Sequence, residues 1–200
     1  MVIIRTATTA DATSILDIYA PFVLNTAISF ETAVPSQKDI EERIEKCLQK
    51  FPWMVCEIDG KMAGYVYGSV HREREAYQWT CESSIYMHPY FKGKGIGQLL
   101  YNSLFTILKI QGLVNVYGGI TLPNKASVKL HEKCGFVHFA TYDNIGYKLD
   151  EWHKVGWWKL QLNEYDPKPS PPLSFYQLDQ NLIGDLCKAS AMEIQLKIRG

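Results

Sequence analysis

A glycine-rich segment near the middle of the chain constrains the fold more than any other feature of the sequence. The segment Lys92-Gly93-Lys94-Gly95-Ile96-Gly97-Gln98 separates a stretch of alternating apolar residues from a stretch with helical periodicity. Glycines let backbone amides approach a ligand, and the first turn of a helix offers free N–H groups and a positive dipole end. The segment therefore predicts a strand, an anion-binding turn and a helix in succession, and a pyrophosphate fits such a turn.

Two common phosphate-binding loops have a different spacing. The Walker loop needs a Lys-Ser/Thr pair that does not follow these glycines, so the side chains for Mg²⁺-nucleotide chemistry are missing. The dinucleotide fingerprint Gly-x-Gly-x-x-Gly does not match the spacing of Gly93, Gly95 and Gly97. Neither of these two nucleotide-binding folds is therefore expected.

Hydrophobic periodicity and turn signals predict the remaining elements. Ser36 and Asp39 form a capping box at the start of a helix, and Asp59-Gly60 is typical of a type I′ hairpin turn. Pro21 is expected to end or kink the first helix. The predicted order is strand 2–7, a helix opened by residues 9–11, a helix from residue 36, hairpin strands 53–58 and 62–70, strand 77–88, helix 95–111, strand 114–121, helix 124–134, strand 136–147 and strand 157–162.

The charge balance excludes one class of partner. The chain has 21 Lys and Arg against 21 Asp and Glu, whereas a nucleic-acid-binding protein normally carries a basic excess. No window approaches the length of a membrane span, and the start of the chain lacks the core of a signal peptide, so a cytoplasmic protein is expected. The five cysteines contain no Cys-x-x-Cys pair, and we expect buried reduced thiols and no metal site.

The composition changes after residue 165. Residues 166–172 are rich in proline, which is typical of an extended linker, and residues 173–200 show only weak helical periodicity. We expect a domain over residues 1–165, a linker over 166–172 and a C-terminal extension over 173–200. The sequence leaves open whether this extension docks on the domain, docks on a second subunit or is loose.

Two ordered motifs resemble those of the GNAT N-acetyltransferase superfamily. Lys92-Gly93-Lys94-Gly95-Ile96-Gly97 is similar to the coenzyme A signature Gln/Arg-x-x-Gly-x-Gly/Ala, with Lys92 at the Gln/Arg position. Asn124-x-x-Ser127-x-x-Leu130-His131-Glu132-Lys133-Cys134-Gly135-Phe136 is similar to the later Asn…Gly-Phe motif. The resemblance implies a mixed, splayed and mostly antiparallel sheet flanked by helices, in the α/β (α+β) class, and acetyl-CoA as co-substrate.

Three further segments resemble the phosphinothricin and methionine sulfone (sulfoximine) acetyltransferase subfamily. They are Arg74-Glu75-Ala76-Tyr77-Gln78-Trp79-Thr80-Cys81-Glu82-Ser83-Ser84-Ile85-Tyr86, Asn144-Ile145-Gly146-Tyr147-Lys148 and Trp152-His153-Lys154-Val155-Gly156-Trp157-Trp158. The resemblance covers about residues 2 to 165. It implies acetylation of the α-amino group of a small amino acid or analogue, by direct transfer in a ternary complex, and a homodimer.

Glu82 and His131 are the candidate catalytic residues. An unpaired Glu82 in an apolar strand needs a function or a partner, and from the residues alone a salt-bridged or outward-facing carboxylate is an equal alternative. The resemblance implies that Glu82 contacts the substrate amine and takes its proton, directly or through a water. It also implies that His131 assists as base or as acid near the sulfur, at a position where a helical histidine is otherwise a surface or satisfied residue.

The resemblance also assigns residues to acetyl-CoA. The backbone of Ile85, Tyr86 and Met87 is expected along the pantetheine arm, with a main-chain amide on the acetyl carbonyl. The pyrophosphate is expected on the amides from Gly93 to Gln98, with charge from Lys92 and Lys94. Asn124 and Ser127 anchor the pantetheine or simply cap a helix. The full set is Ile85, Tyr86, Met87, Lys92, Gly93, Lys94, Gly95, Ile96, Gly97, Gln98, Asn124 and Ser127.

Arginine and aromatic residues are the candidates for holding the substrate. Arg72 and Arg74 offer a guanidinium fork for a carboxylate or phosphinate, and Arg74 matches the subfamily position. Phe30 and Tyr77 are expected as pocket walls, with ordinary core packing as the alternative. Trp152, Trp157 and Trp158 are expected in the core or in a dimer contact.

Two other functions remain open from the sequence. A protein or peptide N-terminal acetyltransferase would share these motifs and need a more open pocket. A non-catalytic acyl-CoA sensor would use the extension at 173–200 as its output, although Glu82 and His131 disfavour it.

Overall fold

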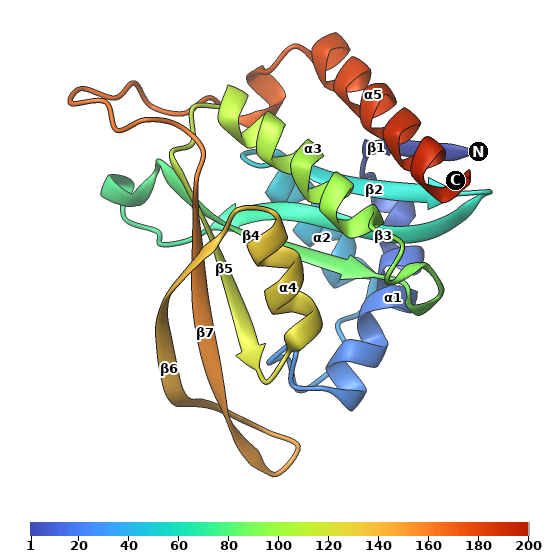
Figure 1. Ribbon diagram of the computed structural model, residues 1–200, viewed down its shortest axis with the longest axis vertical. Helices are drawn as coiled ribbons and strands as arrows, with labels where there is room; N and C mark the ends of the chain where they lie inside the picture. Colours follow the sequence, from blue (N-terminus) through green and yellow to red (C-terminus); the bar gives the residue numbers. More distant parts are fainter. Residues whose placement is uncertain (200) are drawn as a thin grey trace.

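The chain folds around one open seven-stranded sheet with helices on both faces (Figure 1). The computed structural model describes residues 1–199, and Gly200, the last residue of the expected extension, lies outside them. The strands are β1 Val2–Thr6, β2 Trp53–Ile58, β3 Lys61–Val70, β4 Thr80–Met87, β5 Asn115–Leu122, β6 Val137–Lys148 and β7 Glu151–Gln161. The α-helices are α1 Ala12–Asn25, α2 Gln37–Leu48, α3 Ile96–Ile110, α4 Lys125–Lys133 and α5 Gln180–Arg199.

The sheet is mixed because one pair of neighbouring strands is parallel. Its spatial order is β1-β2-β3-β4-β5-β7-β6, and every neighbouring pair except β4 and β5 is antiparallel. The parallel pairing joins Thr80 to Asn115, Cys81 to Val116 and Glu82 to Tyr117, and it ends there although both strands continue. The predicted mixed, mostly antiparallel and splayed sheet is confirmed.

The helices divide between the two faces of the sheet. One core contains Ile96, Leu100 and Leu104 of α3 together with buried residues of α5, and the other contains Ile15 and Ile18 of α1 with α2 residues. Side chains alternate along β4, so successive residues enter different cores. Cys81, Ile85 and Met87 belong to the α3 side, whereas Tyr86 packs on the α1 side. Figure 1 shows α3 beside α5, and the long β6–β7 hairpin extending from the rest of the sheet.

Short-range signals in the sequence predicted several local structures correctly. The Ser36–Asp39 capping box precedes α2, where the Ser36 hydroxyl accepts the amide of Asp39. Asp59 and Gly60 have φ values of 50° and 76°, as a type I′ turn between β2 and β3 requires.

Other boundaries differ from the prediction. Helix α1 continues past Pro21 to Asn25, so Pro21 does not end it. Val23, after the proline, is 1% exposed, and its burial offsets the hydrogen bond that proline cannot make. Strand β7 begins at Glu151 and not at Trp157, because its early residues pair with both β5 and β6.

The C-terminal extension docks on the domain. Helix α5 packs against α3 and β1, with Ile183, Cys187 and Ile194 buried. The proline-rich segment before it has no regular secondary structure, yet the Trp79 indole donates to the carbonyl of Ser170 at 2.8 Å. The sequence left three alternatives for this extension, and the structure shows the first of them.

The cysteines are reduced and mostly buried. All five thiols are free, and burial raises the pKa of Cys187 and Cys134 to about 11. Over residues 1–199 no helix is long and apolar enough to cross a membrane. Nor does that part of the chain bring three or more His, Cys, Asp or Glu side chains together as a metal site.

Candidate active site

The short pairing between β4 and β5 opens a groove beside β4. Helices α3 and α4 cover the opening and enclose a volume of about 440 Å³. The groove is lined by Phe22, Ile28, Ile85, Tyr86, Met87, Phe91, Lys92, Gly93, Gly95, Ile96, Gly97, Gln98, Asn124, Ala126, Ser127, Lys129, Leu130 and Lys133. Every residue predicted to bind the cofactor, except Lys94, is in this set.

The glycine-rich segment forms the end of this groove nearest α3. Gly93 and Gly95 have φ values of 77° and 74°, a left-handed conformation in which side chains are strained. Gly95 is also the N-cap of α3 and has no side chain to accept the amides of the first turn. Those amides, at Ile96, Gly97 and Gln98, are therefore available to an anion in the groove.

Helix α4 supplies the opposite wall. Asn124 caps it, because its side-chain oxygen accepts the amide of Ser127 at 3.1 Å, while both residues also line the groove. Asn124 is therefore a helix cap, and its place in the groove is also compatible with contact to the pantetheine. Lys129 and Lys133 line the same wall at helical spacing, and the sequence analysis did not single them out.

The two lysines of the glycine-rich segment rest on aromatic rings. Lys92 Nζ lies 4.7 Å from the ring centre of Phe22, and Lys94 Nζ lies 4.5 Å from that of Tyr90. Lys92 lines the groove, whereas Lys94 lies beside it.

Glu82 lies on the same face of β4 as Tyr86, at the last position that pairs with β5 before the two strands diverge. Its Oε1 lies 2.8 Å from Nδ1 of His71, and its side chain is 32% exposed. His71 stacks on Tyr117 of β5 with ring centres 4.8 Å apart, and Trp157 meets the imidazole edge-on at 6.1 Å. The carboxylate is thus held by a histidine that is itself fixed between aromatic rings.

His71 was not among the candidate residues from the sequence. No local signal marks it, since its partners Glu82, Tyr117 and Trp157 come from three different strands.

His131 lies behind the groove. It is 4% exposed and packs against Gly118, where an added Cβ would lie 2.8 Å from the ring. Its Nδ1 lies 2.8 Å from the carbonyl of Ser127, which can only accept, so Nδ1 carries the proton and Nε2 accepts from the Tyr101 hydroxyl at 3.1 Å. Burial lowers the pKa of His131, and the ring is neutral near pH 7.

The loop that carries Phe30 is fastened to the β6–β7 hairpin. The Lys148 ammonium, which is buried, donates to the carbonyl of Ser29 at 2.6 Å, and the Phe30 ring fills the space beside Gly146. A Cβ at Gly146 would lie 2.2 Å from that ring. Gly146 and Lys148 of the Gly-Tyr-Lys segment therefore hold the loop in place. The local sequence around these two residues does not predict this role.

The predicted carboxylate-binding arginines are exposed. Arg72 and Arg74 lie in the segment between β3 and β4, and within residues 1–199 neither guanidinium has a hydrogen-bond or ion-pair partner. Tyr77 is 43% exposed and meets the His71 ring edge-on, so it lies near Glu82 and not in the core. Tyr77 and Glu82 therefore lie near each other, because both contact His71. Neither arginine forms an ion pair with Glu82.

The three tryptophans of β7 have different surroundings. Trp158 is 4% exposed and belongs to the core, as expected, and the Trp157 ring packs on Gly119. Trp152 is 62% exposed and contacts the Tyr147 ring, so it is not a core residue of this chain.

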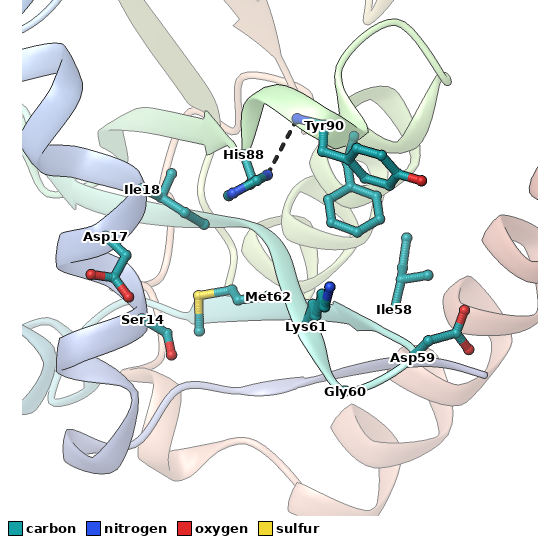
Figure 2. Close-up of a pocket in the computed structure, with 11 residues that line it drawn as sticks. Ser14, Asp17, Ile18, Ile58, Asp59, Gly60, Lys61, Met62, His88 and Tyr90 are labelled. Carbon is teal, nitrogen blue, oxygen red and sulfur yellow. Dashed lines mark hydrogen bonds between the residues drawn. The ribbon is translucent and has the colours of Figure 1, made fainter.

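A second cavity, of about 610 Å³, lies on the α1 side of the hairpin turn (Figure 2). Helix α1 supplies Ser14 and Asp17, and the start of β3 supplies Lys61 and Met62. His88 lies at its edge and accepts the amide of Tyr90 at 3.2 Å. The described residues that line it include none of the predicted site residues, so the groove beside β4 is the better candidate.

The arrangement defines a class of enzyme. A groove with helix amides at one end suits a phosphate-bearing carrier, and a carboxylate a few residues earlier on the strand that borders the groove suits an acceptor that must lose a proton. Residues 4–157 match the family described as acetyltransferase (GNAT) domain. The chain therefore belongs to the GNAT family and is an acetyltransferase.

Two named proteins and one solved structure are similar to this chain over most of its length. The phosphinothricin N-acetyltransferase of Streptomyces viridochromogenes is 34% identical over 169 residues, covering 84% of this chain and 90% of that protein. The L-methionine sulfoximine/L-methionine sulfone acetyltransferase of Salmonella typhimurium is 31% identical over 163 residues, covering 81% and 95%. The crystal structure of a phosphinothricin acetyltransferase from Sinorhizobium meliloti in complex with acetyl-CoA has a TM-score of 0.80 and 28% identity, covering 87% and 98%.

Proposed function

We propose that this acetyltransferase uses acetyl-CoA to acetylate the α-amino group of a small amino acid or analogue of the phosphinothricin or methionine sulfoximine type. The single observation that carries the proposal is the position of Glu82 at the last residue of β4 that pairs with β5, directly before the stretch from Ile85 to Met87 that lines the groove. Carrier and acceptor then meet in one ternary complex, and the acetyl group passes directly between them. The names of the relatives in Streptomyces and Salmonella support this substrate class.

The groove fits acetyl-CoA on its own geometry. The first-turn amides of α3 and Lys92 would hold the pyrophosphate, and Asn124 and Ser127 would lie along the pantetheine. Ile85 to Met87 would present strand backbone to the same arm, because β4 has left its partner β5 there. The acetyl-CoA complex of the Sinorhizobium relative supports this assignment.

Glu82 is proposed as the base. An amino acid arrives as an ammonium ion, and one carboxylate oxygen takes its proton so that the nitrogen can attack the thioester carbon. The C–N bond forms, the C–S bond breaks, and the leaving thiolate takes up a proton. His71 holds the carboxylate through the 2.8 Å contact and is proposed as a positioning residue.

His131 is proposed to act on the groove through Ser127. Both of its ring nitrogens are already hydrogen-bonded, so the neutral ring has neither a free lone pair nor a free proton. Ser127 lines the groove, and its hydroxyl lies 3.4 Å from Nδ1 of His131. The hydroxyl is thereby aimed along the pantetheine path, where it can serve the departing sulfur.

The acceptor would lie on the Glu82 side, between the Phe30 loop and the segment between β3 and β4. Phe30 and Tyr77 would be walls of that site, and Arg72 or Arg74 would pair with the carboxylate of the acceptor. The exposure of both arginines leaves them accessible to such a ligand.

One substrate panel tests the proposal. The purified protein is given acetyl-CoA with phosphinothricin, methionine sulfone, methionine sulfoximine or a short peptide, and thiol release and product mass are measured. We expect acetylation of at least one of the three amino-acid analogues and none of the peptide. Acetylation of the peptide alone would establish the N-terminal acetyltransferase alternative, and acetyl-CoA binding without thiol release would establish the sensor.

We also propose a homodimer that uses the exposed apolar side of the β6–β7 hairpin. The exposed residues there include Val137, Phe139, Ile145, Tyr147 and Trp152, each more than half exposed. Sedimentation equilibrium should give twice the chain mass of 22.9 kDa, and a monomer at all concentrations would refute the proposal. The cytoplasmic location and the absence of nucleic-acid binding stay predictions.

A further inference from the structure

Helix α5 lies outside the residues that match the family, yet it reaches the proposed acetyl-CoA site. The family match ends at residue 157, and α5 begins at Gln180. The helix is part of the core, with Ile194 fully buried and Ala191 8% exposed, so its position is fixed by packing on α3 and β1. Its C-terminal end lies at the beginning of α3 (Figure 1).

The last turns of α5 place a lysine on the glycine-rich segment. A Cβ built on Gly95 would lie 2.6 Å from Nζ of Lys197 and 2.4 Å from its Cε. The ammonium therefore occupies the space where any other residue at position 95 would place its side chain. Gly95 lines the groove whereas Lys197 itself does not, so the ammonium lies outside the groove against the residue that directly precedes the free α3 amides.

Nothing in the described chain neutralises this charge. Among residues 1–199 no carboxylate lies within ion-pairing distance of Lys197, and its side chain is exposed. The lysines of the glycine-rich segment itself are placed differently, since Lys92 rests on Phe22 and Lys94 on Tyr90. The Lys197 ammonium thus lies close to the α3 N-cap, and in the described part of the chain no aromatic ring lies beneath it.

We propose that Lys197 binds a phosphate group of coenzyme A, so that the C-terminal extension completes the carrier site of this enzyme. The inference rests on the proposed use of acetyl-CoA. The phosphate is either the pyrophosphate on the α3 amides or the phosphate monoester on the ribose, and both offer charged oxygens to an ammonium group. The extension is then a part of the binding site and not only a covering of the core.

Calorimetric titration with coenzyme A tests the proposal without depending on turnover. K197M keeps the aliphatic stem and removes the charge, and K188M on the same helix is the matched control, because Lys188 is exposed and paired with Asp185. We expect K197M to weaken coenzyme A binding about 3- to 10-fold and to reduce the salt dependence of Kd, with no change in K188M. The melting temperature of K197M should equal that of the wild type, since the side chain is exposed.

Dephospho-coenzyme A separates the two phosphates. Equal binding of dephospho-coenzyme A to the wild type and K197M assigns Lys197 to the ribose phosphate, and a persisting difference assigns it to the pyrophosphate. Identical Kd values of wild type and K197M for coenzyme A would overturn the inference while leaving the proposed function intact. Failure of the wild type to bind coenzyme A would overturn both.

Discussion

Replacing Glu82 by Gln removes the proposed base while keeping the shape of the side chain. The amide can still hydrogen-bond to His71, which lies 2.8 Å from the carboxylate, so the aromatic cluster around the imidazole should stay in place. The side chain is partly exposed and is not among the residues that line the groove. The folding stability and the affinity for acetyl-CoA should therefore change little.

The kcat of E82Q should be lower than that of the wild type by the whole factor that general base catalysis contributes. That contribution is about 100- to 10,000-fold, which corresponds to about 3 to 5 kcal/mol of transition-state free energy. Because the remaining enzyme can still use an amine that is already deprotonated, the kcat of E82Q should rise with pH until the ammonium group of the substrate loses its own proton.

Steady-state kinetics from pH 6 to 10, with calorimetric Kd values for acetyl-CoA, measure both effects. E45Q is the matched control, because Glu45 is an exposed glutamate on α2 without a role in the site. If E82Q keeps the kcat of the wild type at neutral pH, Glu82 is not the base and the geometric argument from β4 fails.

Three further substitutions probe the surroundings of this base. H71F keeps the stack on Tyr117 but loses the hydrogen bond, and should lower kcat about tenfold with an unchanged KM for acetyl-CoA; a larger effect on that KM would contradict the positioning role. G146A displaces Phe30 and should raise KM for the amino acid while leaving the Kd of acetyl-CoA unchanged, as measured by kinetics and calorimetry. Burial lowers the pKa of His131. Below about pH 6.5 this histidine is therefore protonated in the unfolded chain but not in the folded chain, so the free energy of unfolding falls with decreasing pH. In urea unfolding, the free energy of unfolding of H131Q should fall less between pH 7 and pH 5 than that of the wild type. An equal fall in both proteins would refute the lowered pKa of His131.

The sequence was sufficient wherever the cause of a structure is local. The Asp59-Gly60 turn needs two left-handed residues, and the capping box at Ser36 needs only a neighbour three residues away. The glycine-rich segment likewise predicts a turn between a strand and a helix, and in the structure Gly93 and Gly95 of this turn have left-handed backbone conformations. For Glu82, the residues alone left a functional carboxylate and a salt-bridged or outward-facing one as equal alternatives, and only the resemblance to GNAT enzymes implied the role of base.

The partners of the site residues could not be predicted, because they come from distant segments. The histidine that holds Glu82 follows another strand, and the ammonium of Lys148 reaches a loop more than a hundred residues earlier in the chain. Of the two effects expected of Pro21, ending or kinking the first helix, the structure excludes the first, since tertiary packing of α1 outweighs the missing hydrogen bond. Lys197 has no sequence signal at all, because its place depends on how α5 docks.

The alternation of side chains along β4 separates two kinds of evolutionary change. Cys81, Ile85 and Met87 project to the side of α3, while Glu82 and Tyr86 project to the other. Under the proposed mechanism, a mutation beside Glu82 alters the acceptor side of the strand while Ile85 and Met87 keep their place along the carrier, and Tyr86, which also lines the groove, is the exception. Selection can then exchange acceptors at such positions within one lineage while the carrier is inherited unchanged.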